Sequence, residues 1–166
     1  IRTNPFVDLK AAVLGNPRRF YFVTTEKAQR VLDACPDAQW RLLFALSRYG
    51  GLRCPSEHLA LRWEDVNWAQ NRIAIQSPKT EQPPGGESRL IPLFPERRPY
   101  LNGVWEQAEP GTKYVITRYR ASNANLRTQR QKIILRAGLK PWPKLFQNLR
   151  SSRQTELEES FPSHVV

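Results

Sequence analysis

A strongly apolar helix that stops at two glycines constrains the fold of this chain more than any other feature. Asp37 is a good N-cap residue, and the helical pattern that follows it continues through Tyr49. Its bulky apolar residues include Leu42, Leu43, Phe44 and Leu46. A surface helix would not carry so many of them in succession. We therefore expect this helix at the centre of the fold, with Gly50-Gly51 as its end.

The remaining patterns predict a mainly helical chain with one β-hairpin. Arg72 to Gln76 alternates apolar and polar residues as a strand does, and Arg89 to Leu93 forms a second such segment. The Pro- and Gly-rich stretch between them is typical of a hairpin tip. Further helices are predicted from Thr24 or Thr25 to Ala34, from Glu57, and over Tyr100–Gln107, Asn125–Ala137 and Gln147–Glu159, with a turn at Asn67–Gln70. The predicted fold class is α+β, with a small antiparallel hairpin or sheet at one edge.

The segment after the two glycines joins an arginine to a short amphipathic helix. It reads GLRCPSEHLALRWEDV, and Pro55 suits the first turn of a helix because its missing N–H breaks no hydrogen bond there. Arg53 lies four residues before Glu57, whose carboxylate can brace the guanidinium as a fixed phosphate-binding fork. The residues expected to face the core are Leu59, Ala60, Leu61 and Trp63. Taken alone, such a pair is more often a plain ion pair at a helix start.

The positive charge of the chain is concentrated in one quarter of the sequence. The formal net charge is +11, and the stretch from Thr112 to Gln154 contains eleven Lys or Arg and no Asp or Glu. Such a block suits a surface that follows a nucleic-acid backbone, although a solvated helix face has the same composition. The candidate DNA contacts are Arg118, Arg120, Arg127, Arg130, Lys144 and Arg153.

Composition excludes several other classes of protein. The 166 residues can bury one good core and do not suffice for two full domains. No apolar run is long enough to span a membrane, so we expect a soluble, cytoplasmic protein. Cys35 and Cys54 lack metal or redox spacing and are expected to be reduced structural residues. No metal site and no cofactor are predicted.

The segment around Arg53 resembles the first arginine box of the tyrosine recombinase (phage integrase) family, in which GLR is followed by Glu and an LxW-x-D run. The resemblance implies that Arg53 holds a scissile DNA phosphate and that Glu57 orients it. SPKTE followed by SRLIPL is similar to the family's β-hairpin, where Lys79 matches the lysine that protonates the departing 5′ oxygen. KLFQNLRSS resembles the box of the second arginine, which Arg150 matches near a helix start.

The third box departs from the family pattern at one position. Family members usually place His three residues before the second arginine, and this chain has Gln147 there. Glutamine can donate a hydrogen bond to a phosphate, but it cannot exchange protons near neutral pH. We therefore expect Gln147 to bind the phosphate without acid–base chemistry, so that more of this chemistry falls on Lys79.

The resemblance also implies a mechanism and a domain organisation. A tyrosine attacks the phosphorus to form a 3′-phosphotyrosine, and a second 5′ hydroxyl reverses the step, so neither ATP nor a metal is needed. The implied partner is double-stranded DNA, with self-association of the full-length protein on it, in a bacterial or phage-derived setting. Residues 1–20 are expected to be a linker from an upstream DNA-binding domain, and residues 21–166 a catalytic domain that is incomplete at its C-terminus.

Several residues are not expected to act in catalysis. The family's nucleophile follows the second arginine, whereas Tyr114 and Tyr119 precede Arg150. His58 and His164 are expected to be structural. Two alternatives stay open at this point: a DNA-binding module without catalytic activity, and an RNA-associated helical protein that uses only the basic block.

Overall fold

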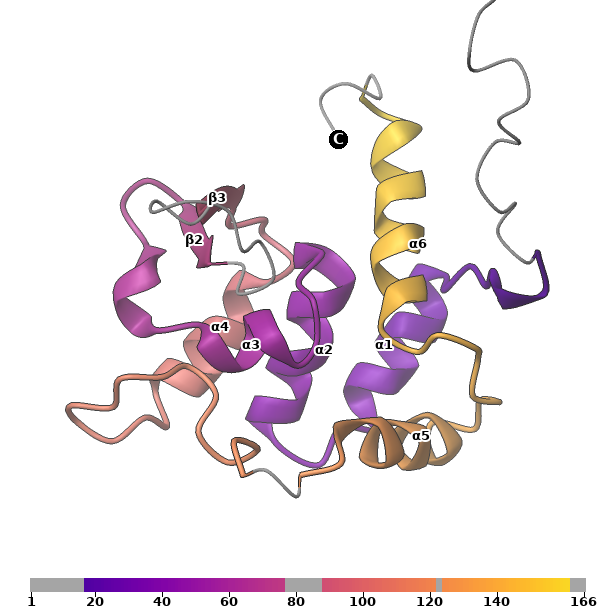
Figure 1. The fold of residues 1–166 in the computed structure, drawn as a ribbon, viewed down its shortest axis with the longest axis horizontal. Coiled ribbons are helices and arrows are strands. Elements are labelled where there is room, and N and C mark those ends of the chain that lie inside the picture. Colours follow the sequence, from indigo (N-terminus) through magenta and orange to yellow (C-terminus); the bar gives the residue numbers. More distant parts are fainter. Residues whose placement is uncertain (1–16, 77–87, 122–123, 162–166) are drawn as a thin grey trace, which may run out of the picture.

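The computed structural model of the chain describes residues 17–76, 88–121 and 124–161 (Figure 1). Its helices are α1 (Thr25–Asp33), α2 (Ala38–Gly50), α3 (Ser56–Ala60), α4 (Arg98–Trp105), α5 (Leu126–Arg136) and α6 (Gln147–Glu158), with 3₁₀ turns at η1 (Pro17–Arg19) and η2 (Trp63–Asp65). Its strands are β1 (Val66–Asn67), β2 (Arg72–Gln76) and β3 (Ser88–Pro92). The predicted α+β fold with a small antiparallel sheet is confirmed, and this sheet lies at one edge, away from α1, α5 and α6. Among the described residues, no helix is both long and apolar enough to cross a bilayer.

The helix ends follow from local capping chemistry. The Thr24 side chain accepts a hydrogen bond from the backbone N–H of Lys27, and Asp37 accepts one from the N–H of Trp40 at 2.8 Å. These bonds satisfy N–H groups that have no partner inside their helix. Gly51 ends α2 in the left-handed region with φ of 65°, where a side chain would be strained. The predicted starts of α1 and α2 and the predicted glycine end of α2 are therefore confirmed.

Helix α2 is the centre of the packing. Every residue from Leu42 to Tyr49 is buried, and the helix packs against α1, α4 and α6. In Figure 1 it lies between α4 on one side and α1 and α6 on the other. Truncating a wholly buried side chain such as Leu43 to alanine would cost roughly 2–5 kcal/mol, because it leaves a cavity. This helix is therefore the rigid support for the segments attached to its ends.

The sheet is antiparallel with the order β1-β2-β3. The register pairs Ile73 with Ile91 and Ile75 with Arg89, so these side chains share the face that packs on the core. Ile73 and Ile75 are buried, while their neighbours along β2 are more exposed. The predicted hairpin strands are present, but the segment that joins them, including Lys79, lies outside the described residues.

Two expectations about the segment after α3 are wrong. The turn predicted at Asn67–Gln70 begins one residue later, because Val66 and Asn67 form the short strand β1 against β2. Helix α3 also stops at Ala60, since Leu61 takes an extended conformation and its carbonyl accepts a bond from the N–H of Val115. A helix of five residues has no long apolar face, and its buried residues are the polar Glu57 and His58. Of the residues expected to face the core, Leu61 is buried and Leu59 and Trp63 pack against the core, whereas Ala60 is exposed.

Candidate phosphate-binding site

The backbone of Arg53 is held from two directions in the loop between α2 and α3. Its N–H donates to the Oε2 atom of Glu57 at 2.7 Å. Its carbonyl oxygen accepts from the backbone N–H of Glu57 at 2.9 Å and lies 3.0 Å from Nδ1 of His58. The side chain of Arg53 is 49 % exposed, so a fixed backbone carries a guanidinium that reaches the surface.

The Glu57 carboxylate is wholly buried, and its closest ion-pair partner is Arg89 on strand β3. Arg89 donates from its two terminal nitrogens to the two carboxylate oxygens at 2.8 and 2.7 Å. The nearest guanidinium nitrogen of Arg53 lies 3.8 Å from Oε1. Burial favours the neutral acid, but the hydrogen bonds from Arg89 and from the Arg53 N–H together hold the pKa of Glu57 below its usual value. Glu57 is therefore ionised at neutral pH.

Sequence reasoning placed Glu57 against the Arg53 side chain, and the structure adds a different main partner. Glu57 holds Arg53 chiefly through the backbone N–H, and Arg89 provides the two-bond ion pair. A signal for Arg89 was present in the strand pattern. Arg89 alternates with Ile91 on the inward side of β3, and an arginine at an inward position needs a buried acceptor.

Arg150, which lies far from Arg53 in the sequence, is subject to the charges of the same group of residues. It lies in the first turns of α6 and is half-buried. Burial lowers its pKa, and the positive charges of Arg53 and Arg89 lower it further, while the charge of Glu57 opposes them. The charges of Arg53, Glu57 and Arg89 thus act on Arg150. We call Arg53, Glu57, Arg89 and Arg150 the arginine cluster.

The charges of the arginine cluster favour an anion. The guanidinium groups of Arg53 and Arg89 contact one carboxylate, and their charges also act on Arg150. Positive charge therefore exceeds negative charge at a place that remains open to solvent through the side chains of Arg53 and Arg89. Guanidinium groups present several N–H donors in a plane, which matches the oxygens of a phosphate. The cluster is therefore suited to hold a phosphodiester.

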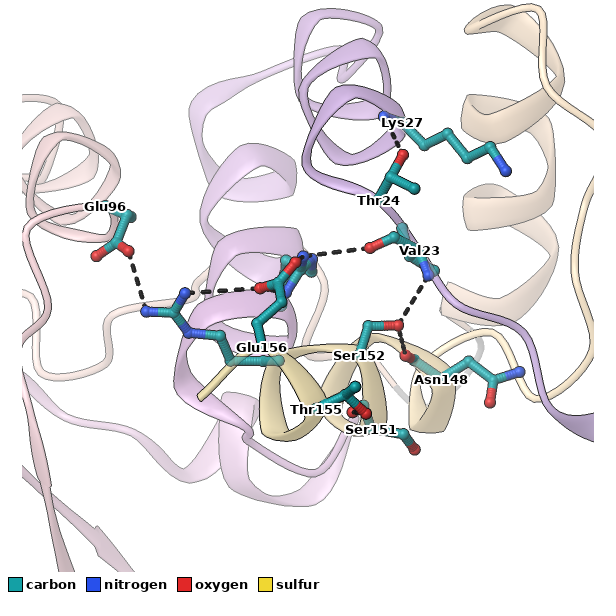
Figure 2. Close-up of polar contacts among 11 residues, drawn as sticks. Val23, Thr24, Lys27, Glu96, Asn148, Ser151, Ser152, Thr155 and Glu156 are labelled. Carbon is teal, nitrogen blue, oxygen red and sulfur yellow. Dashed lines mark hydrogen bonds and ion pairs between the residues drawn. The ribbon is translucent and has the colours of Figure 1, made fainter. Parts of the chain in front are cut away.

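Helix α6 is fixed to the rest of the fold by a chain of polar contacts (Figure 2). Ser152 accepts a hydrogen bond from the backbone N–H of Val23 at 2.8 Å and donates to the carbonyl of Asn148 at 2.7 Å. Glu156 forms a two-bond ion pair with the wholly buried Arg48 of α2, which also donates to the carbonyl of Val23. These contacts set the position of the helix that carries Arg150.

Two other predicted catalytic positions are less defined. Gln147 is the first residue of α6 and its side chain is exposed. Its carbonyl oxygen accepts a hydrogen bond from the Ser151 hydroxyl at 3.1 Å. Lys79 lies outside the described residues. The proposed roles of Gln147 and Lys79 therefore stay predictions.

Four of the six predicted DNA contacts lie on the surface. Arg127 and Lys144 are exposed. Arg118 is exposed and pairs with Asp37 at 3.2 Å. Arg120 donates to the Leu59 carbonyl, and its guanidinium lies 3.6 Å from the centre of the Tyr114 ring. All four cations remain accessible enough to approach a nucleic-acid backbone.

The other two predicted contacts are used inside the protein. Arg130 is 1 % exposed, with its guanidinium between the rings of Phe44 and Phe146 at 4.8 and 4.1 Å. Arg153 forms ion pairs with Glu96 and Glu156 and is largely covered. A cation that is buried, or already paired on both sides, does not reach a DNA phosphate in this conformation. Arg130 and Arg153 therefore do not belong to the predicted DNA-binding surface, because their positions on α5 and α6 place both side chains against the protein interior.

The remaining ionisable residues do not form a second reactive group in the described part of the chain. Burial raises the pKa of Cys35 and of Cys54 to about 12, so both thiols stay protonated. Tyr119 donates its hydroxyl to Asp37, and burial together with this bond raises its pKa to about 12. Within residues 17–76, 88–121 and 124–161, no group of three His, Cys, Asp or Glu side chains is arranged to hold a metal ion.

Comparison with known proteins gives matches in structure alone. No model of a known protein family matches the sequence, and no curated protein matches it. The structure is similar to that of XerA recombinase, with a TM-score of 0.70 and 16 % identity over 93 % of this chain. It is also similar to lambda integrase (residues 75–356) bound to DNA, with a TM-score of 0.65 and 19 % identity over 90 % of this chain. The chain spans 55 % of each of these two structures, and it has a tyrosine recombinase/integrase-like fold.

Proposed function

We propose that this chain binds double-stranded DNA and holds a scissile phosphodiester for site-specific recombination. The observation that carries the proposal is the arginine cluster, in which Glu57 holds the Arg53 backbone and binds Arg89, and the charge of Arg53 acts on Arg150 from a distant part of the sequence. A plain ion pair at a helix start would not need the second arginine. The recombinase-like fold supports the same function.

In this proposal the two arginines bind the non-bridging oxygens of the phosphate. They neutralise the charge that builds up on the five-coordinate phosphorus when a tyrosine attacks and a 3′-phosphotyrosine forms. Gln147 donates a further hydrogen bond, and Lys79 protonates the 5′ oxygen as it leaves. Removing one such donor from a preorganised site costs roughly 3–4 kcal/mol of barrier. In this proposal the chain supplies the phosphate-binding part of the site.

The experiment incubates the whole protein with a nicked DNA site that traps the covalent intermediate. Arg53→Ala and Arg150→Ala should abolish the adduct with only a modest loss of DNA affinity, because many other cations bind the backbone. Arg41→Ala is a matched control, since Arg41 is an exposed arginine on α2 outside the arginine cluster. Wild-type adduct formation in both site variants would overturn the proposal.

A second candidate function is DNA binding without catalysis. The observation that favours it is Gln147, which stands where a proton-exchanging histidine would be expected and cannot replace that chemistry. This candidate predicts tight, salt-dependent DNA binding by the whole protein and no covalent adduct on any nicked site. The recombination proposal predicts the adduct, so one gel under denaturing conditions separates the two.

A further inference from the structure

Arg89 links the hairpin to the loop that carries Arg53. It lies on β3, directly across from Ile75 of β2, and its two terminal nitrogens bind both oxygens of Glu57 on α3. Glu57 in turn accepts the backbone N–H of Arg53 with the Oε2 atom that Arg89 also binds. The sheet is thus connected to the backbone of Arg53 through a single carboxylate.

Bulk solvent does not reach the Glu57 carboxylate and therefore does not hydrate its charge. The Glu57 side chain is 0 % exposed, so its charge and orientation depend on the protein groups around it. A two-bond guanidinium contact fixes both the plane and the direction of a carboxylate, whereas a single donor fixes only a distance. The position of the Arg89 guanidinium therefore determines where the Oε2 atom of Glu57 lies relative to the Arg53 N–H.

The Arg89–Glu57 ion pair joins a partly exposed arginine to a wholly buried carboxylate. It therefore compensates the buried charge of Glu57, which an apolar side chain at this inward position of β3 would leave without its main partner. Compensation of charge alone does not require two parallel bonds that also fix the plane of the carboxylate. A two-bond contact is useful if Glu57 has to hold the loop between α2 and α3 so that Arg53 binds a phosphate in one orientation.

We propose that Arg89 is a positioning residue of the phosphate-binding site: its two-bond contact fixes Glu57, and Glu57 fixes the backbone from which Arg53 reaches the phosphate. This inference rests on the proposed function. The positive charge of Arg89 also acts on Arg150, so Arg89 contributes to the field at the site without needing to touch the DNA.

The decisive variant is Arg89→Lys, which keeps the charge and loses the paired donors. Arg72→Lys is its matched control, because Arg72 is an exposed arginine on the neighbouring strand β2. In Arg89→Lys, amide hydrogen exchange at Arg53 should be faster by about tenfold, because its acceptor is no longer held in place. Arg72→Lys should leave this exchange unchanged. Exchange at Leu43, in the middle of α2, reports whether the fold itself has loosened.

The same variants are then compared in single-turnover adduct formation by the whole protein at saturating DNA. Arg89→Lys should slow this step by about 100-fold, the effect of a small misplacement, while the DNA dissociation constant stays close to that of the wild type. A purely electrostatic role would instead be rescued by lysine. Unchanged Arg53 exchange, or a wild-type rate, in Arg89→Lys would overturn the positioning role.

Failure of the proposed function gives a different pattern of results. If Arg53→Ala forms the adduct at the wild-type rate, the phosphate-binding assignment is wrong. The exchange measurement then still decides whether Arg89 fixes the Arg53 backbone, since it needs neither DNA nor catalysis. Loss of exchange protection at both Arg53 and Leu43 in Arg89→Lys would assign the residue to general stability and would also overturn its positioning role.

Discussion

His58 fixes the backbone of Arg53 through a hydrogen bond from its Nδ1 atom to the Arg53 carbonyl oxygen, at 3.0 Å. A carbonyl only accepts, so the ring carries its proton on Nδ1 and Nε2 faces the Ser47 hydroxyl of α2, also at 3.0 Å. The imidazole is wholly buried, and this burial lowers its pKa to about 4. Neutral His58 thus connects the loop that carries Arg53 to the central helix α2 through hydrogen bonds.

We expect the free energy of unfolding to decrease as the pH falls from 6.5 towards 4. His58 titrates near 6.5 when exposed and near 4 when folded, so between these values the unfolded state binds more protons than the folded state. The contribution of His58 to the free energy of unfolding is complete above pH 6.5. About 3 kcal/mol of it is lost between pH 6.5 and pH 4. Urea unfolding at a series of pH values measures this dependence.

His58→Asn separates this effect from that of the other titratable groups. The asparagine amide can still donate to the Arg53 carbonyl, but it does not titrate. The variant should therefore show a flatter pH profile between pH 6.5 and 4.5. Glu57, whose pKa is lowered from 4.5, adds its own loss of stability only at more acidic pH. Parallel profiles for the variant and the wild type would contradict the assignment.

The features that could be predicted from sequence are those set by local chemistry. Thr24 and Asp37 cap their helices because the acceptor lies three residues from its donor, and Gly51 ends α2 because only glycine adopts its backbone conformation without strain. The hairpin followed from alternation in β2 and β3. In each case the partners lie close together in the chain, so the sequence pattern already contains the interaction.

The features that could not be predicted depend on contacts between distant segments. The Arg89–Glu57 ion pair joins residues 32 positions apart, and its existence depends on how the sheet is placed beside α3, which packs against β2. Arg130 lies in a basic stretch that resembles a DNA-binding surface, but its position on α5 places its side chain between Phe44 and Phe146. A basic stretch gives the charge of a surface and does not reveal which of its cations face inward.

Glu156→Gln is expected to destabilise the protein by roughly 3 kcal/mol. Arg48 is wholly buried, and removing the charge of its carboxylate partner leaves an uncompensated cation inside the fold. Glu158→Gln is the matched control, because Glu158 lies on the same helix, is exposed and contacts only Gln154 among the bonds described for it. Chemical denaturation measures both variants. Equal stability of the two would show that the Arg48 charge has another source of compensation.

Two glycine substitutions should change stability in opposite directions. Gly51→Ala places a side chain at φ of 65° and should destabilise the protein by about 1 kcal/mol, although no atom lies near the new Cβ. Gly103→Ala lies within α4 with open space around the new Cβ, and it should stabilise the protein by about 1 kcal/mol. Thermal unfolding measures both shifts. A Gly51→Ala variant as stable as the wild type would mean that α2 can end in another conformation.

Arg130→Met and Arg127→Met test which cations of α5 face DNA. In the described part of the chain the guanidinium nitrogens of Arg130 have no hydrogen-bond partner, and burial lowers its pKa to about 10. Methionine of similar length should leave stability unchanged or raise it by about 1 kcal/mol, because the cost of the buried charge disappears. The salt dependence of DNA binding should not change.

Arg127→Met should give the opposite result, since Arg127 is exposed on the same helix. Stability should be unaffected, while the slope of log K against log salt should fall by about one, as expected when one phosphate contact is lost. Fluorescence anisotropy with duplex DNA over a range of salt concentrations measures both slopes. If Arg130→Met reduced the slope and Arg127→Met did not, the buried arginine would have to become exposed on binding, and the surface assigned to DNA would need to be redrawn around it.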